Sequence, residues 1–180
     1  MDKPDHNQKI GILGGSFNPA HAGHLEISLR ALDILKLDVV WWLVSPGNPL
    51  KSDMEMATFE TRMKSAQEKA NDPRIIVSDL ENTLGTTYTI DTLEKITEMH
   101  PEHHFVWLMG ADNLAEFDQW KSWRKIATTV PFAIFNRPSY SKPSLEGIAA
   151  NELAEHRIDQ SQANTLYSLK PPAWVYCERT

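Results

Sequence analysis

Two histidines stand three residues apart at the end of a glycine-containing stretch, GGSFNPAHAGH, which covers residues 14–24. The glycines allow the backbone to approach a phosphate group closely, and a helix that starts behind them offers unpaired N–H groups at the positive end of its dipole. His21 and His24 are about one helical turn apart, so both side chains can face the same anion. The stretch therefore predicts a phosphate-binding loop.

The same stretch also allows simpler interpretations. Two glycines after a strand often form only a tight turn, and a single histidine often lies on the surface or caps a helix. The H-x-x-H spacing also occurs in metal sites, although no cysteine or third close ligand accompanies it here. The glycines match neither G-x-G-x-x-G nor G-x-x-x-x-G-K-[ST], so the loop indicates neither a dinucleotide cofactor nor a P-loop.

The composition is that of one globular domain. The chain has 180 residues and a formal net charge of −6, and it lacks the basic surface that attracts polynucleotides, so no nucleic-acid partner is expected. No apolar run reaches membrane-spanning length, and the polar start carries no secretory signal. A single cysteine, Cys177, excludes an internal disulfide and favours the cytoplasm. No feature of the sequence defines an oligomeric state.

Apolar runs alternate with helical patterns along the chain. Strands are expected at residues 9–13, 38–44, 74–77, 104–109, 132–135 and 173–177. Helices are expected after residue 21, with Leu25, Ser28 or Leu29, Leu32 and Leu35 on one face, and at 58–70, 89–99, 113–128 as one or two helices, and 145–156.

Near-continuous apolar strands separated by helices predict an α/β fold, a doubly wound parallel sheet with right-handed crossovers. Ligands of such sheets bind beyond the carboxyl ends of the strands, near the switch in strand order. The loops that follow the strands are therefore the candidate site, at residues 14–21, 45–51, 78–89, 110–112 and 136–140.

Taken whole, GGSFNPAHAGH resembles the signature of the nucleotidyltransferase superfamily that carries the H-x-G-H motif, a group with a Rossmann-like fold. Further segments, in matching order and spacing across residues 9–140, resemble bacterial nicotinate-nucleotide adenylyltransferases. They are NPLK at 48–51, TYTIDTL at 87–93, GADN at 110–113, Trp120, and Arg137 with Pro138.

This resemblance implies transfer of AMP from ATP to nicotinate mononucleotide, which gives nicotinate adenine dinucleotide and pyrophosphate in NAD biosynthesis. The phosphate of the mononucleotide is already nucleophilic at neutral pH, so neither a catalytic base nor a covalent intermediate is expected. Magnesium would enter with ATP and neutralise the leaving pyrophosphate, without a metal site of the protein itself.

The resemblance also implies residue roles. His21 and His24 would be catalytic and contact the ATP phosphates, the second stabilising charge at the α-phosphorus. Further ATP-binding positions would be Gly14, Gly15, Ser16, Phe17, Asn18, Gly23, Lys51 and Arg137. Trp120 would stack on the pyridine ring, Thr89 and the amide of Lys121 would meet the nicotinate carboxylate, and Asp112 would face ribose hydroxyls. The mononucleotide-binding positions are thus Tyr88, Thr89, Gly110, Asp112, Trp120 and Lys121.

Each of these residues also has an ordinary structural interpretation. A threonine in Thr87-Tyr88-Thr89 could simply cap a helix, and Asp112 could cap the helix after it. Trp120 is one of six tryptophans and could belong to the core. Lys51 and Arg137 could be solvated surface charges.

One part of the family pattern is missing. The family usually has a late helix start of the form S-[SA]-T-x-x-R that meets the ATP phosphates, and SQANTL at residues 161–166 does not fit it. We therefore expect residues 1–180 to form a single nucleotidyltransferase domain without that segment. The alternatives are a sister enzyme acting on pantetheine phosphate or nicotinamide mononucleotide, a catalytically silent nucleotide-binding domain, and a nicotinamide-dependent oxidoreductase.

Overall fold

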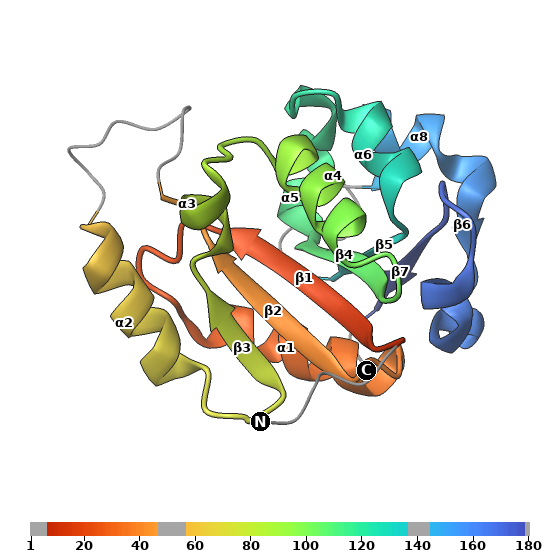
Figure 1. Cartoon of the computed structure of the whole chain (residues 1–180). Coiled ribbons are helices and arrows are strands. Elements are labelled where there is room, and N and C mark those ends of the chain that lie inside the picture. The colour runs from red at the N-terminus through yellow and green to blue at the C-terminus, as the bar shows by residue number, and fades with distance from the viewer. Residues whose placement is uncertain (1–6, 47–56, 137–144, 179–180) are drawn as a thin grey trace.

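The computed structural model describes residues 7–46, 57–136 and 145–178, which form a seven-stranded sheet with helices on both faces (Figure 1). The strands are β1 (Lys9–Gly15), β2 (Val39–Val44), β3 (Ile75–Ser78), β4 (His104–Gly110), β5 (Phe132–Phe135), β6 (Arg157–Ile158) and β7 (Trp174–Cys177). The α-helices are α1 (Ala22–Ile34), α2 (Phe59–Lys69), α3 (Leu80–Leu84), α4 (Thr89–Met99), α5 (Ala111–Glu116), α6 (Trp123–Thr129) and α8 (Ile148–Glu152). The 3-10 helices are η2 (Phe117–Gln119), η3 (Ala154–His156) and η4 (Gln160–Ser168).

All neighbouring strands are parallel, in the order β3-β2-β1-β4-β5-β7-β6. The chain builds outward from β1 to β3 and then returns to the other side of β1 with β4. The switch in strand order therefore lies between β1 and β4, where Leu13 is paired with Leu108. A ligand crevice is expected beyond the carboxyl ends of these two strands.

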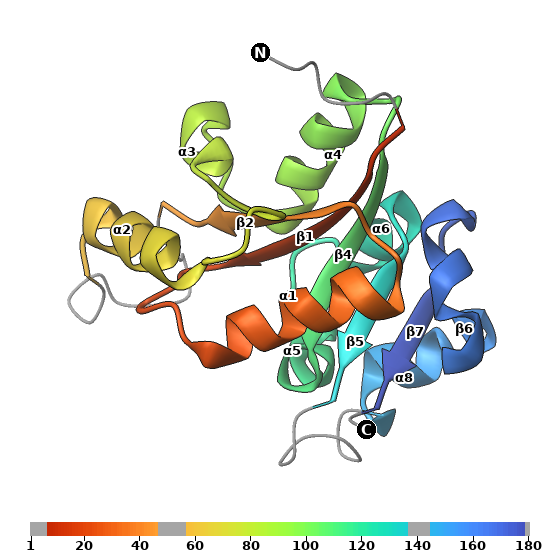
Figure 2. The ribbon, with the colours of Figure 1, turned by 90° about the horizontal axis from the view of Figure 1, so that it is seen from below.

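Two apolar cores lie on opposite faces of the sheet. Trp42 of β2 packs into the core beneath α1, α2 and η4, whereas its neighbour Leu43 packs into the core beneath α4, α5, α6 and α8. This alternation follows from the opposite directions of successive side chains along a strand. Figure 2 shows α1 on one side of the sheet and α3 and α4 on the other.

The doubly wound α/β prediction is confirmed, and all six expected strands are present. β1 continues past its expected end at Leu13 as far as Gly15, and α4 has the predicted bounds. The segment expected as one or two helices at 113–128 is divided between α5, η2 and α6.

Other expectations were wrong in detail. The single helix at 145–156 is broken, because α8 begins only after Gly147 and ends at Glu152 before η3. On α1 the expected buried face is confirmed at Ser28, Leu32 and Leu35, but Leu29 is exposed, and Ile27 and Ala31 are buried as well. The short elements α3 and β6 were missed, since five and two residues are too few to show a period. No helix in the described ranges has the length and apolar character needed to cross a bilayer.

Candidate active site

A cavity of about 720 Å³ lies at the carboxyl ends of β1, β2 and β4. Phe17 and Ile27, at its wall, belong to the core on the α1 face, whereas Trp107 and Ile126 belong to the core on the α4 face. The cavity therefore reaches both faces of the sheet across its edge, at the switch in strand order. This is the position expected for a ligand of a doubly wound fold.

The cavity brings together every sequence-predicted site residue that the structure describes. From the β1–α1 loop and the start of α1 come Gly14, Gly15, Ser16, Phe17, Asn18, His21, Gly23 and His24. From the segment before α4, the end of β4 and the η2–α6 region come Tyr88, Thr89, Gly110, Asp112, Trp120 and Lys121. Lys51 and Arg137 lie outside the described residues.

His21 and His24 cap the first turn of α1 reciprocally. His21 is the N-cap residue, and its Nδ1 accepts a 3.1 Å hydrogen bond from the backbone N–H of Gly23, while the Nδ1 of His24 accepts a 3.0 Å bond from the backbone N–H of His21. A neutral imidazole whose Nδ1 accepts must carry its proton on Nε2. Both rings, whose centroids are 4.0 Å apart, therefore have Nε2–H as their donor.

A buried layer supports the His24 ring. Phe17, which is 1% exposed, lies beneath it with ring centroids 4.4 Å apart, and Trp42 stacks on Phe17 at 5.2 Å. The Trp42 indole donates to the Ser28 hydroxyl, which donates in turn to the carbonyl of His24. Phe17 can therefore contribute its backbone to the cavity while its side chain holds His24 in place.

Arg62 of α2 was missed by the sequence analysis. The residue is 2% exposed, and its guanidinium donates to the carbonyl oxygens of Ser16, Ser45, Pro46 and Ala57. It thereby joins α2 to the loops that follow β1 and β2. The sequence does show an arginine among apolar helix positions, which could have drawn attention to it. Its hydrogen-bond partners, however, come from separate loops that only the fold brings together.

Trp107 of β4 is a second missed residue. A Cβ added at Gly14 would lie 2.7 Å from the Trp107 ring, so position 14 must be glycine for the indole to lie against β1. Trp107 is 4% exposed, and its Nε1–H is buried with no hydrogen-bond partner among the described residues. Its ring meets Trp120 edge to face at 6.1 Å. The Trp107 ring thus lines the cavity, while its N–H is a buried donor that no described residue satisfies.

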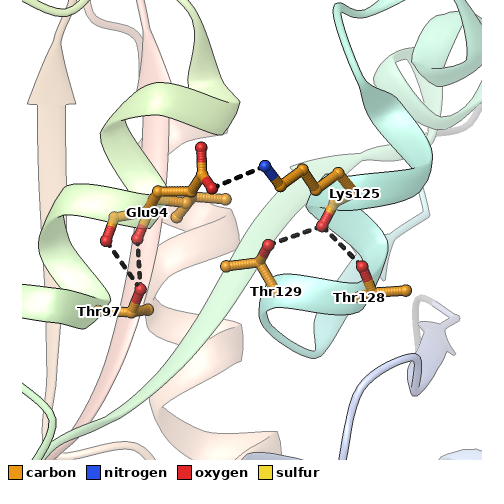
Figure 3. A network of polar contacts seen from close by, with 6 residues as sticks. Glu94, Thr97, Lys125, Thr128 and Thr129 are labelled. Carbon is orange, nitrogen blue, oxygen red and sulfur yellow. Dashed lines mark hydrogen bonds and ion pairs between the residues drawn. The ribbon is translucent and has the colours of Figure 1, made fainter.

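The wall on the α4 face is held by contacts between α4 and the α6 region. Lys121 Nζ lies 4.4 Å above the ring of Tyr88, and the side chains of Glu94 and Lys125 form a 2.9 Å ion pair between α4 and α6 (Figure 3). Tyr88 is the N-cap of α4 and no side chain caps that helix, so the interpretation of a capping threonine is wrong. These contacts fix the spacing between Thr89 and the α6 side of the cavity.

Asp112 lies in the first turn of α5, where the N-cap is Gly110 and no side chain caps the helix. The interpretation of Asp112 as a cap is therefore wrong as well. Its Oδ1 is buried without a hydrogen-bond partner in the described part of the chain. Trp120 packs partly buried against the core and also lines the cavity.

Glu81 of α3 is the third missed residue, and like Trp107 it lines the cavity. It is 7% exposed, and its Oε2 accepts a 2.8 Å hydrogen bond from the hydroxyl of Thr92. Burial raises the pKa of the Glu81 carboxyl, an effect that the bond from Thr92 only partly offsets. It lies in a segment that had been expected to be only a loop.

The fold and the site together are those of nucleotide-transferring proteins with a Rossmann-like fold. The features in question are the strand order, the cavity at the switch point and the helix that begins at two histidines. In agreement, the model of the cytidylyltransferase-like family matches residues 12–169. A protein of Parvibaculum lavamentivorans named "Probable nicotinate-nucleotide adenylyltransferase" is 50% identical over 170 residues, 94% of this chain and 85% of that protein. One of the same name from Erythrobacter litoralis is 53% identical over 154 residues, 86% of this chain and 70% of that protein.

The chain therefore belongs to the nicotinate-nucleotide adenylyltransferase family. Its fold resembles that of the Plasmodium falciparum nicotinic acid mononucleotide adenylyltransferase solved with NaAD, with a TM-score of 0.71 and 21% identity over 96% of this chain and 76% of that one. At this identity the likeness concerns the fold alone.

Proposed function

We propose that this protein transfers AMP from ATP to nicotinate mononucleotide and releases pyrophosphate. An oxygen of the mononucleotide phosphate attacks the α-phosphorus of ATP, and the bond from that phosphorus to the β-bridging oxygen breaks. The product is nicotinate adenine dinucleotide. The identities with named members of the family across most of the chain support this activity.

The observation that carries the mechanism is the reciprocal cap of His21 and His24. Because both Nδ1 atoms accept backbone hydrogen bonds, each ring carries its proton on Nε2, and the two Nε2–H donors lie together at the start of α1. Such an array stabilises the negative charge that builds on the phosphate oxygens in the transition state. Gly14, Gly15, Ser16, Phe17, Asn18 and Gly23 are proposed to line the ATP phosphates, with Lys51 and Arg137 as further cations.

The α4 side of the cavity is proposed to hold the mononucleotide. Trp120 stacks on the pyridine ring there, and Thr89 at the start of α4 and the amide of Lys121 meet the nicotinate carboxylate, which suits the positive end of the α4 dipole. Asp112 at the start of α5 accepts from ribose hydroxyls, and Gly110 and Tyr88 complete the wall.

A divalent cation, which we propose to be magnesium, enters as part of the ATP complex and neutralises charge on the departing pyrophosphate. Among the described residues, His100, Glu102 and His103 form the cluster whose ligand atoms lie close enough to hold an ion. That cluster adjoins the start of β4, at the edge of the sheet opposite the cavity. The cation in the reaction is therefore assigned to ATP rather than to a site of the protein.

Residues 1–180 are proposed to act as one nucleotidyltransferase domain, in the cytoplasm, where ATP is available. The test is pyrophosphate release with ATP and magnesium, with nicotinate mononucleotide, nicotinamide mononucleotide and pantetheine phosphate compared as acceptors. Selective turnover of nicotinate mononucleotide is expected. Selective turnover of either other acceptor would assign a sister activity, and binding of ATP without turnover of any would indicate a silent nucleotide-binding domain.

A further inference from the structure

The carboxyl group of Glu81 is an unusual component of a cavity proposed to hold an acid. It lies at the α3 wall, almost fully buried, and its hydrogen bond from Thr92 engages only Oε2. Within the described ranges, Oε1 has no hydrogen-bond partner and no cation pairs with the carboxyl group. One oxygen is thus available to a ligand.

The hydroxyl groups behind Glu81 suit either charge state. The Oγ1 of Thr92 lies 2.8 Å from the Oγ1 of Thr86 and 3.3 Å from the carbonyl oxygen of Tyr88. The Thr92 hydroxyl donates to Oε2 of an ionised Glu81, and it can keep donating to Oε2 when the proton of a protonated Glu81 lies on Oε1. Both threonines are buried, so water does not compete for these bonds.

The charged groups around this carboxyl do not neutralise it. The other ionisable groups of the cavity wall are His21 and His24 at the start of α1, Tyr88 before α4, Asp112 and Glu116 on α5, and Lys121 before α6. The ammonium group of Lys121 lies over the Tyr88 ring, and the adjoining strand β2 carries no ionisable side chain. Lys95 of α4 donates to the carbonyl of Leu84 instead.

We propose that Glu81 determines specificity by reading the substituent at position 3 of the pyridine ring. Protonated Glu81 donates a hydrogen bond to the carboxylate of nicotinate, whereas ionised Glu81 accepts one from the N–H of a carboxamide. This inference rests on the proposed function, which places the pyridine ring beside Thr89 and Trp120. Two carboxylates in one dry cavity repel each other, so binding of the acid takes up one proton from solvent when Glu81 is ionised in the free enzyme.

The consequence is a pH-dependent choice between acid and amide. The ratio of kcat/KM for nicotinate mononucleotide to that for nicotinamide mononucleotide should fall as pH rises, by up to roughly tenfold per pH unit once free Glu81 is ionised. Both substrates carry the same phosphate, and both meet the same histidines. The pH dependence of the phosphate and of the histidines therefore cancels in the ratio. The pH dependence that remains comes from the recognition of the substituent at position 3.

The experiment measures this ratio from about pH 5.5 to about pH 8.5 in the unchanged chain, in Glu81→Gln and in Thr92→Val. The E81Q variant has an N–H donor at every pH, so its ratio should not change with pH and should favour the acid. The T92V variant loses the hydrogen bond from the Thr92 hydroxyl that favours the ionised carboxyl of Glu81. The fall in the ratio of kcat/KM values should therefore occur at higher pH in this variant. Glu98→Gln, an exposed change on α4, is the control.

Proton uptake supplies a readout that does not depend on turnover. Calorimetric binding of nicotinate mononucleotide in two buffers with different ionisation enthalpies should show uptake of up to one proton by the unchanged chain and none by E81Q. A ratio that is flat in the unchanged chain, or equally sloped in E81Q, would overturn the role of Glu81. If neither acceptor is turned over, the proposed function is refuted, but the calorimetric measurement still decides the role of Glu81. A lack of nicotinate mononucleotide binding in that measurement would also overturn the role of Glu81.

Discussion

The Nη1 atom of Arg62 donates a 2.9 Å hydrogen bond to the carbonyl oxygen of Ser16. This bond joins α2 to the glycine loop of the proposed ATP site. Two further contacts run alongside it, from the N–H of Ala20 to the Ser65 hydroxyl and from the N–H of Ala57 to the Asn18 side chain. The shape of the loop therefore depends on a helix that follows it by about forty residues.

Replacing Arg62 with lysine should weaken ATP binding more than it slows the chemical step. Lysine has a single donor atom and cannot serve four carbonyl oxygens at separate positions. We expect KM for ATP to rise about tenfold, with a smaller change in kcat, and the melting temperature to fall because buried carbonyls lose their partners. Steady-state kinetics and thermal unfolding check both. Lys69→Met, an exposed change on the same helix, is the control, and an unchanged KM for ATP in R62K would contradict the positioning role.

Replacing His24 with alanine should remove both a transition-state donor and one half of the helix cap. Loss of one such donor typically lowers kcat by about 100- to 1000-fold, whereas loss of a cap costs about 1 kcal/mol of stability. The fold should therefore survive at room temperature while turnover collapses. Circular dichroism and pyrophosphate release separate the two effects, with the exposed His156→Ala as the matched control. Near-normal turnover in H24A would refute the assigned role.

Replacing Gly14 with alanine should destabilise the protein through Trp107. The new Cβ would lie 2.7 Å from the indole, and overpacking of this kind costs about 1–3 kcal/mol. Phenylalanine at position 107 is shorter and should relieve the clash. The double variant of Gly14→Ala and Trp107→Phe is thus expected to be more stable than the two separate losses would predict. Urea unfolding of all four proteins measures the coupling, and strict additivity would show that the ring is not the obstacle.

The buried carboxyl of Glu81 also makes stability depend on pH. Its pKa is raised in the folded state, so the folded protein holds this proton more tightly than the unfolded chain. Relative to a neutral side chain, its contribution is therefore most favourable below the unfolded pKa of about 4.3 and is lost as pH rises toward the folded pKa. The stability difference in favour of Glu81→Gln should grow with pH across this interval and then level off. Urea unfolding at several pH values checks it; a difference that shrinks with rising pH would have the wrong sign.

Much of the fold follows from short-range pattern. The apolar runs that became β1, β2, β4, β5 and β7 are dense enough to predict, because strands covered on both faces need apolar residues at successive positions. The segment at 145–156 has a helical composition, but Gly147 and the turn at Leu153 divide it. The two residues of β6 form a strand only because β7 lies beside them.

The candidate site could likewise be predicted from the sequence only in part. Residues that are adjacent in sequence, such as His21 and His24, can be predicted together because one helix start positions both. Arg62, Trp107 and Glu81 were missed because their importance lies in contacts between separate elements of the fold, with Ser16, Gly14 and Thr92 respectively. Such contacts depend on the order of the strands and on the side-chain packing around them.

The most direct test of AMP transfer uses ATP labelled at its α-phosphorus, with nicotinate mononucleotide and magnesium. The label should appear in nicotinate adenine dinucleotide, in amounts equal to the unlabelled pyrophosphate released, and none should remain bound to the protein. Label that stays in ATP, or that is recovered on the protein chain, would contradict direct transfer of AMP to the mononucleotide phosphate.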